Sequence, residues 1–250
     1  MRKLLLSAGI AILCLPMLFV IWLLLASRWS RMDAATMQAP PSLRKTIAEM
    51  VLQKADYGKE SLPALDRALR LDPQNGDAWS RRCGLPFDED TAPSLKDCEA
   101  AVQFNKGPYD YYRLGRAQDA LNNPCTAEDS FTQATSATAS NPDYTYIDSM
   151  GRAALRCGHL PAGRAGLETA IELEEKSLKD PEDHDDEIAD TKKDMLTDRE
   201  YLIVLYNREH ENTLAAEACS ATHPDWKSCN CDLDPKGLVA CAEGQSQSKR

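Results

Sequence analysis

The sequence predicts an all-α fold in which antiparallel helix pairs stack into a solenoid behind an N-terminal transmembrane helix. Three observations support this class. An uncharged apolar run opens the chain, a spacing pattern of small and large residues recurs every 33 to 36 residues, and only 6% of residues are aromatic although 43% are hydrophobic. A low aromatic content favours helices packed through Ala and Leu over an aromatic-rich β-sandwich. The 250 residues suffice for one or two domains with a sizeable core.

The charge balance is acidic, with 29 basic and 39 acidic residues and a formal net charge of −10. Nucleic acid is therefore excluded as the main partner, because binding to phosphates needs a basic surface. Residues 1–31 hold four of the basic residues and none of the acidic ones, so residues 32–250 carry 25 basic and 39 acidic groups, or −14. We expect anionic lipid to repel this part of the chain.

The apolar run at the start of the chain is long enough to cross a membrane. Its 23 residues, Leu4 to Ala26, include no charged residue, and as a helix they would span about 35 Å, more than a ~30 Å hydrocarbon core. Trp22 and Trp29 stand where aromatic interface anchors belong. The alternative is a cleaved signal peptide, but its apolar region is usually about 7–15 residues and the small-x-small cleavage pattern is missing. Residues 1–31 are therefore predicted to form a retained anchor.

Residues 32–41 are predicted to be a short linker, and a repeat follows it. Triplets with a small residue, a large residue four positions later and Ala three positions after that occur four times, with Cys98 as a smaller exception at the large position. They are Ser61, Leu65 and Ala68; Ser94, Cys98 and Ala101; Ala127, Phe131 and Ala134; and Gly163, Leu167 and Ala170. On a helix these positions share one face, with the small residue where a neighbouring helix must approach closely. The triplets therefore predict core contacts between stacked helices.

A second pattern precedes each of the later triplets. It comprises Trp79, Arg82 and Cys83; Tyr111, Leu114 and Gly115; and Ile147, Met150 and Gly151. Together the two patterns resemble the tetratricopeptide repeat, whose signature is an aromatic residue, Leu-Gly, and a later Ala-x3-Phe, Ala and Pro over ~34 residues. The best match is Tyr111, Leu114, Gly115, Ala127, Phe131 and Ala134. The resemblance covers about residues 42–178, and it departs from the family at Cys83, Pro86 and Lys106.

The resemblance implies that a protein or peptide binds to the concave face, which the first helices of the repeats line. The residues placed there are Tyr109, Tyr112, Arg116, Asp148 and Arg152. Arg116 and Arg152 occupy equivalent positions on successive helices, so they could clamp a carboxylate or an acidic peptide. The alternative is that both arginines pair with Asp119 and Asp148 on a solvated face.

Residues 179–250 are predicted to form an irregular end of the solenoid. The acidic stretch 180–190 is expected to be an exposed connection, since it lacks the alternating ligands and the turn Gly of an EF-hand loop. Helices are expected over 186–208 and 212–221. The sequence His-Pro-Asp-Trp at 223–226 is similar to Asn-Pro-Asp-Tyr at 141–144, as if another repeat begins there. Terminal repeats of a solenoid are usually atypical because they cap the stack.

The cysteines outside the apolar run predict disulfides. They number eight: Cys83, Cys98, Cys125, Cys157, Cys219, Cys229, Cys231 and Cys241. In the repeat geometry, Cys83 and Cys98 lie at matching heights in one antiparallel pair, so their Cβ atoms could approach within the ~4 Å that a disulfide needs. Cys125 and Cys157 lie at the same turn edge, one layer apart. The last four would link the C-terminal segment, with 219–241 or 229–241 among several open pairings.

Two alternatives to disulfides remain open. Free cysteines can serve as small buried hydrophobic residues, which suits Cys83 and Cys98. A zinc site could use Cys219, His223, Cys229 and Cys231, although this spacing is not a common zinc-finger pattern. Disulfides are favoured, and they need an oxidising compartment. The sequence therefore predicts a single-pass membrane protein with a cytoplasmic N-terminus and an extracytoplasmic, periplasmic repeat domain.

Enzymatic motifs are missing from the sequence. It contains no Gly-rich phosphate loop, no Gly-x-Ser-x-Gly and no His-Glu-x-x-His, so we expect no catalysis, metal or cofactor. The leading hypothesis is a membrane-tethered scaffold that binds a protein or peptide outside the cytoplasm, for instance in envelope assembly. The alternatives are a cytoplasm-facing adaptor with a zinc site and a thiol-dependent assembly or redox helper that uses Cys229 or Cys231. The sequence leaves the partner and the oligomeric state open.

Overall fold

The computed structural model describes residues 36–53, 62–85, 94–179, 185–226, 228–234 and 237–243. The predicted transmembrane anchor, residues 1–31, lies outside these ranges, as do residues 180–184 of the predicted acidic connection. Among the helices within these ranges, none is both long and apolar enough to cross a membrane.

The chain divides into two compact units, residues 1–78 and 79–250. In the first unit, helix α2 (Pro41–Gln53) packs against α3 (Leu62–Leu71). Among its described residues, this unit buries Ala48, Leu65, Ala68 and Ala78 most fully, each at 0% exposure. Helix α4 (Gly76–Cys83) begins at a side-chain cap, in which Asn75 Oδ1 accepts a hydrogen bond of 2.9 Å from the Ala78 N–H.

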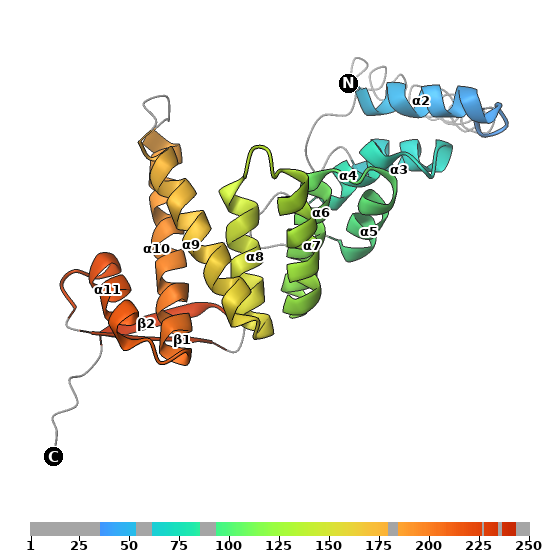
Figure 1. Cartoon of the computed structure of the whole chain (residues 1–250). Coiled ribbons are helices and arrows are strands. Elements are labelled where there is room, and N and C mark those ends of the chain that lie inside the picture. The colour runs from blue at the N-terminus through green and yellow to red at the C-terminus, as the bar shows by residue number, and fades with distance from the viewer. Residues whose placement is uncertain are drawn as a thin grey trace, which may run out of the picture. The chain divides into compact units, whose positions relative to one another are not determined.

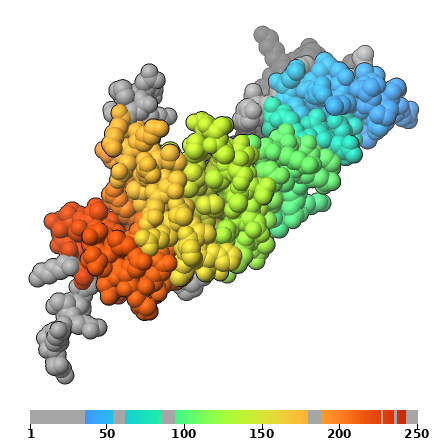
Figure 2. Space-filling view, viewed as in Figure 1, coloured from blue at the N-terminus to red at the C-terminus, as the bar shows by residue number. Residues whose placement is uncertain are grey.

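The second unit is built from helices that pack against their neighbours in chain order. They are α5 (Leu95–Phe104), α6 (Pro108–Ala120), α7 (Pro124–Ala137), α8 (Tyr144–Cys157), α9 (Leu160–Ser177) and α10 (Asp185–Arg208). Figure 1 shows α6 to α9 standing side by side. In Figure 2 the surfaces of these four helices run into one another from green to yellow. The second unit is therefore a stack of helices in which each layer covers the one before it.

Local sequence signals set several helix ends. Proline occupies the first position of α6 and α7, where its missing N–H costs nothing. The Asp143 side chain accepts a hydrogen bond from the Thr145 N–H at 2.9 Å and caps α8. Gly158 ends α8 with φ of +90°, a left-handed conformation that glycine adopts without strain. These caps keep the connections between α6, α7, α8 and α9 short.

The second helices of the pairs bury the triplet residues that the spacing singles out. Cys98, Ala101, Ala127, Phe131, Ala134, Leu167 and Ala170 are all at most 3% exposed. The small residues allow close approach of α8 and α9. A Cβ atom added at Gly166 would lie 2.9 Å from the Gly151 Cα, and one added at Gly151 would lie 2.9 Å from the Leu167 backbone nitrogen. The helical repeat fold is thus confirmed.

The C-terminal end departs from the all-α prediction. After α11 (Asn212–Thr222), the chain forms an antiparallel hairpin of β1 (Cys229–Leu233) and β2 (Val239–Glu243). The expectation that another repeat begins at residue 223 is wrong. The physical reason is a two-residue period: Cys229, Cys231 and Leu233 pack against α10, while Asn230 and Asp232 are exposed.

Candidate functional site

Aromatic side chains gather on α6 and α8, in the part of the chain where the sequence places the binding residues. Tyr109 and Tyr112, three positions apart on α6, stack with ring centroids 6.1 Å apart and an interplanar angle of 18°. The Tyr112 ring also lies 5.0 Å from that of Tyr146 on α8 and 5.8 Å from that of Phe131 on α7. Phe131 is buried, whereas Tyr109 is 49% exposed. The three tyrosines therefore form one cluster, which packs on the buried Phe131 and is exposed at Tyr109.

Two arginines flank this cluster and differ in their contacts. The Arg113 guanidinium lies 3.9 Å from the Tyr109 ring centroid and donates a 2.7 Å hydrogen bond to the Ser80 carbonyl. Arg116 is exposed, and it has no hydrogen bond or ion pair among the described residues. Burial raises the pKa of Tyr112. The positive charge of Arg116 opposes this rise, and the negative charge of Asp148 adds to it. We call Tyr109, Tyr112, Arg113, Arg116 and Tyr146 the tyrosine–arginine surface.

Arg152 is partly buried, with its side chain 26% exposed, and it is held by carboxylates of α8 and α10. Its Nε donates a 2.8 Å hydrogen bond to Asp198 Oδ1 on α10, and its Nη2 lies 2.7 Å from the same oxygen. It also pairs with Asp148 one turn earlier on α8. Asp148 is 7% exposed and Asp198 is fully buried. Arg152 is therefore engaged with two aspartates of α8 and α10, whereas Arg116 is exposed, and a clamp formed by the two arginines stays a prediction.

The alternative pairing in the sequence analysis is half right. Arg152 does pair with Asp148, but in a buried setting. Asp119 pairs with Arg156 of α8 and not with Arg116. Of the five residues proposed for the groove, Tyr109, Tyr112 and Arg116 lie together on one surface, while Asp148 and Arg152 belong to the buried cluster. Peptide binding by the first three stays a prediction.

The buried cluster contains more carboxyl groups than arginines. Besides Asp148 and Asp198 it includes Glu174 of α9, which is 0% exposed and whose two carboxyl oxygens have no hydrogen-bond partner among the described residues. Burial raises the pKa of Glu174 to about 8, with a further rise from Asp198 and Asp194 that Arg152 and Arg199 oppose. Burial also raises the pKa of Asp148 and of Asp198. At neutral pH the Glu174 carboxyl is thus mostly protonated.

All eight cysteines of the repeat and C-terminal parts form disulfides. The predicted pairs Cys83–Cys98 and Cys125–Cys157 are both present. The remaining bonds are Cys219–Cys229 and Cys231–Cys241, so the pairings 219–241 and 229–241 are wrong. The hairpin explains this difference, because its register places Cys231 directly opposite Cys241 and leaves Cys229 for α11.

The proposed zinc ligands do not come together as a set. His223 pairs with Glu200 at 3.0 Å, and its ring stacks on Trp226 with centroids 3.8 Å apart. In the described part of the chain, two groups of Cys, His and Glu have ligand atoms within 4.8 Å of one another: Glu128, Cys157 and His159; and Glu200, His223 and Cys241. Both cysteines are in disulfides and offer no thiolate to a metal.

Comparison with known proteins identifies the architecture. No protein-family model matches the sequence, and neither does any curated protein. The structure is similar to the crystal structure of YrrB, described as a TPR protein with an unusual peptide-binding site. The TM-score is 0.55 at 14% identity, over 73% of this chain and 86% of that one. The fold is a tetratricopeptide-repeat (TPR) solenoid. A second solved structure is PilW, described as a type IV pilus biogenesis factor. It superposes with a TM-score of 0.40 at 16% identity, over 75% of this chain and 95% of PilW.

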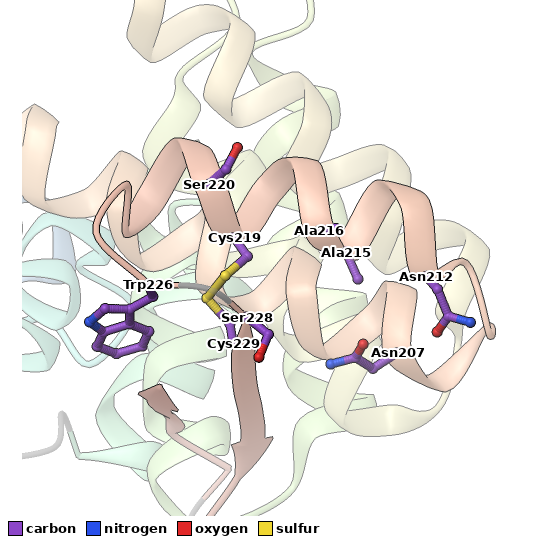
Figure 3. A pocket seen from close by; sticks show the side chains of 9 residues that line it. All are labelled: Asn207, Asn212, Ala215, Ala216, Cys219, Ser220, Trp226, Ser228 and Cys229. Atoms are coloured by element: carbon purple, nitrogen blue, oxygen red, sulfur yellow. A yellow bond between two sulfur atoms is a disulfide. The ribbon is translucent and has the colours of Figure 1, made fainter. Parts of the chain in front are cut away.

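Beyond the TPR helices lies a pocket that the sequence did not predict. It has a volume of about 190 Å³ between α10, α11 and the start of β1. In Figure 3 the Cys219–Cys229 disulfide lies between the Trp226 ring on one side and the amides of Asn207 and Asn212 on the other. One face of α11 supplies five of the lining residues, at positions 212, 215, 216, 219 and 220, and the others come from the end of α10 and from the segment that leads into β1. A helical spacing marks the α11 face, but nothing in the sequence indicates which segments lie opposite it.

Proposed function

We propose that this protein is a membrane-tethered TPR scaffold that binds a protein or peptide on the extracytoplasmic side. The observation that carries the binding proposal is the tyrosine–arginine surface. There, the exposed Tyr109 and the half-buried Tyr112 lie on the same helix as Arg116, a cation without an ion pair among the described residues. The fold supports this role, since YrrB, which shares it, is described as having a peptide-binding site.

The chemistry of this surface suits a peptide ligand. Tyr and Arg are enriched among the residues that contribute most to protein–protein binding, because a tyrosine covers a large apolar area and keeps a hydroxyl group for hydrogen bonding. The exposed Tyr109 stacks on Tyr112, which itself packs against the buried Phe131, so little side-chain freedom is lost on binding. Arg116 can hold a carboxylate through two parallel hydrogen bonds. The surface would therefore take a segment with an apolar or aromatic side chain beside an acidic one.

The proposed location rests on two features. Leu4 to Ala26 is an uncharged run of the length of a transmembrane helix. Four disulfides join the eight remaining cysteines, and such bonds persist in oxidising compartments. The same bonds argue against the cytoplasmic zinc adaptor. Protease added to intact cells, or to cells with a permeabilised outer envelope, should digest the repeat domain, and full protection would contradict this location.

Replacing Arg116 or Tyr109 with Ala should weaken partner binding about tenfold each, because each change removes one central contact worth ~1.4 kcal/mol. Retention of partner proteins by the immobilised full chain, quantified by mass spectrometry, measures the effect. The matched control is Arg208→Ala, since Arg208 is an exposed arginine on α10 whose ion pair with Asp232 is long, at 3.9 Å. Equal losses in the control and in Arg116→Ala would refute the assignment of the surface.

A further inference from the structure

The Cys125–Cys157 disulfide differs from the other three in its exposure. Cys125, the second residue of α7, is exposed, and Cys157, the last residue of α8, is partly exposed. Cys83 and Cys98 are 0% exposed. Each of the two C-terminal disulfides has one cysteine that is buried, at 3% exposure for Cys219 and 6% for Cys231. An incoming reagent can therefore reach the Cys125 side of this bond most easily.

A histidine and a glutamate lie in line behind the other sulfur of this bond. His159 Nε2 is 3.9 Å from Cys157 Sγ, and His159 Nδ1 is 2.8 Å from Glu128 Oε2. The two ring nitrogens thus face different partners, with the carboxylate on one side and the sulfur on the other. Glu128 comes from α7 and is mostly buried, whereas the His159 side chain is 62% exposed and precedes α9. This order of groups is the one that activates a cysteine for nucleophilic chemistry.

The local backbone favours a negative charge on one of the two sulfurs. Cys125 follows Pro124 at the start of α7, where the unpaired N–H groups and the helix dipole stabilise a thiolate. Cys157 ends α8, where the dipole disfavours a negative charge. His159, held by Glu128, places its Nε2 3.9 Å from Cys157 Sγ, where it can hydrogen-bond to this sulfur. A disulfide whose reduced form is stabilised in this way is opened more readily.

We propose that Cys125–Cys157 is a site of thiol–disulfide exchange that captures an external thiol. The incoming thiolate attacks Cys125 Sγ and forms a new S–S bond to it, while the Cys125–Cys157 bond breaks. The electron pair of the broken bond stays on Cys157 Sγ, beside His159 Nε2, and this sulfur then takes up a proton from solvent. The products are a mixed disulfide on Cys125 and a thiol on Cys157, with no net oxidation or reduction. The reverse reaction releases the captured thiol.

The other group of glutamate, histidine and cysteine, Glu200, His223 and Cys241, lacks two features of the Cys125–Cys157 site. His223 directs its Nε2 at Glu200 and stacks on Trp226, and Cys231, which an attacker would have to reach for Cys241 to leave, is 6% exposed. Cys83–Cys98 lies in an apolar cluster with Leu114 and Ala117. These disulfides therefore serve as internal controls in the same molecule.

Glutathione provides the test. The oxidised full-length protein in detergent is incubated with it, quenched with acid at intervals, and mapped by mass spectrometry. We expect the first adduct on Cys125, with Cys157 as the free thiol and Cys83–Cys98 intact. His159→Ala should slow formation of this adduct about tenfold because the leaving sulfur loses the imidazole beside it. The matched control, His210→Ala, replaces another exposed histidine and should leave the rate unchanged.

A second variant and a second probe separate the chemistry from a change in fold. Glu128→Gln should slow the reaction less than His159→Ala, since it leaves the imidazole in place, and helical circular dichroism should match the wild type in both variants. A cysteine-containing peptide replaces glutathione in a parallel series, and the faster probe indicates whether the natural thiol is a small molecule or a polypeptide. A first adduct on any other cysteine, or an unchanged rate in His159→Ala, overturns the proposal.

Discussion

Replacing Arg152 with Ala is expected to lower the free energy of unfolding at pH 7 by about 3–5 kcal/mol, because it leaves buried carboxyl groups without their cation. Arg152 holds both Asp148 and Asp198, and Asp198 is fully buried. The loss of stability in Arg152→Ala should become smaller as the pH is lowered. The raised pKa values of Asp148 and Asp198 mean that these carboxyl groups lose their charge at a higher pH than ordinary aspartates do. Urea unfolding followed by circular dichroism, at about pH 7 and at about pH 5, measures this change.

The control for this prediction is Arg164→Ala. Arg164 also contacts several carboxylates, Glu168 and Glu211 among them, but at the surface of α9. Exposed ion pairs contribute roughly 0–1 kcal/mol, so this variant should stay near the wild type. If Arg152→Ala were no less stable than Arg164→Ala, the buried cluster would not hold α8 and α10 together as described.

The stability of the wild type should decrease as pH rises towards 8, and Glu174→Gln should remove most of this decrease. The pKa of Glu174 is raised from 4.5 to about 8 by burial and by Asp198, so between these values the folded state binds more protons than the unfolded state. Stability from this group is complete below its unfolded pKa and is lost as pH rises through its folded pKa, at roughly 1 kcal/mol per pH unit. Unfolding curves across this range give the slope directly.

Glu172→Gln is the matched control for the pH dependence, since Glu172 is an exposed residue on the same helix. It should keep the slope of the wild type. A wild-type slope in Glu174→Gln as well would mean that Glu174 does not titrate between its unfolded and folded values.

The repeat core was predictable because its information is local. Leu167 and Ala170 on one helix face, with Gly163 below them, recur at the repeat spacing and are buried as expected. The same regular geometry gave Cys83–Cys98 and Cys125–Cys157. Where the period of the helix pair applies, a pattern in the sequence translates directly into contacts between elements.

Contacts outside that period could not be predicted. Asp198 lies 46 positions from Arg152 among many acidic residues, so nothing in the sequence singles it out as the partner that buries the arginine. Residues 223–226 resemble the start of a repeat, but the chain forms a hairpin after them. Buried and exposed side chains alternate around Cys229 and Cys231, which is the two-residue period of a strand. His159 stands two positions from Cys157 in the chain, but its bond to Glu128 depends on the turn between α8 and α9.

The central claim, that the tyrosine–arginine surface binds a partner outside the cytoplasm, is tested most directly by photo-crosslinking in intact cells. A photoreactive amino acid replaces Tyr109 or, as the control, Thr132, an exposed residue of α7. We predict a discrete crosslinked product with an extracytoplasmic protein from position 109, none from position 132, and loss of the product when Arg116→Ala is added. Equal crosslinking from both positions, or a product unaffected by Arg116→Ala, would contradict the claim.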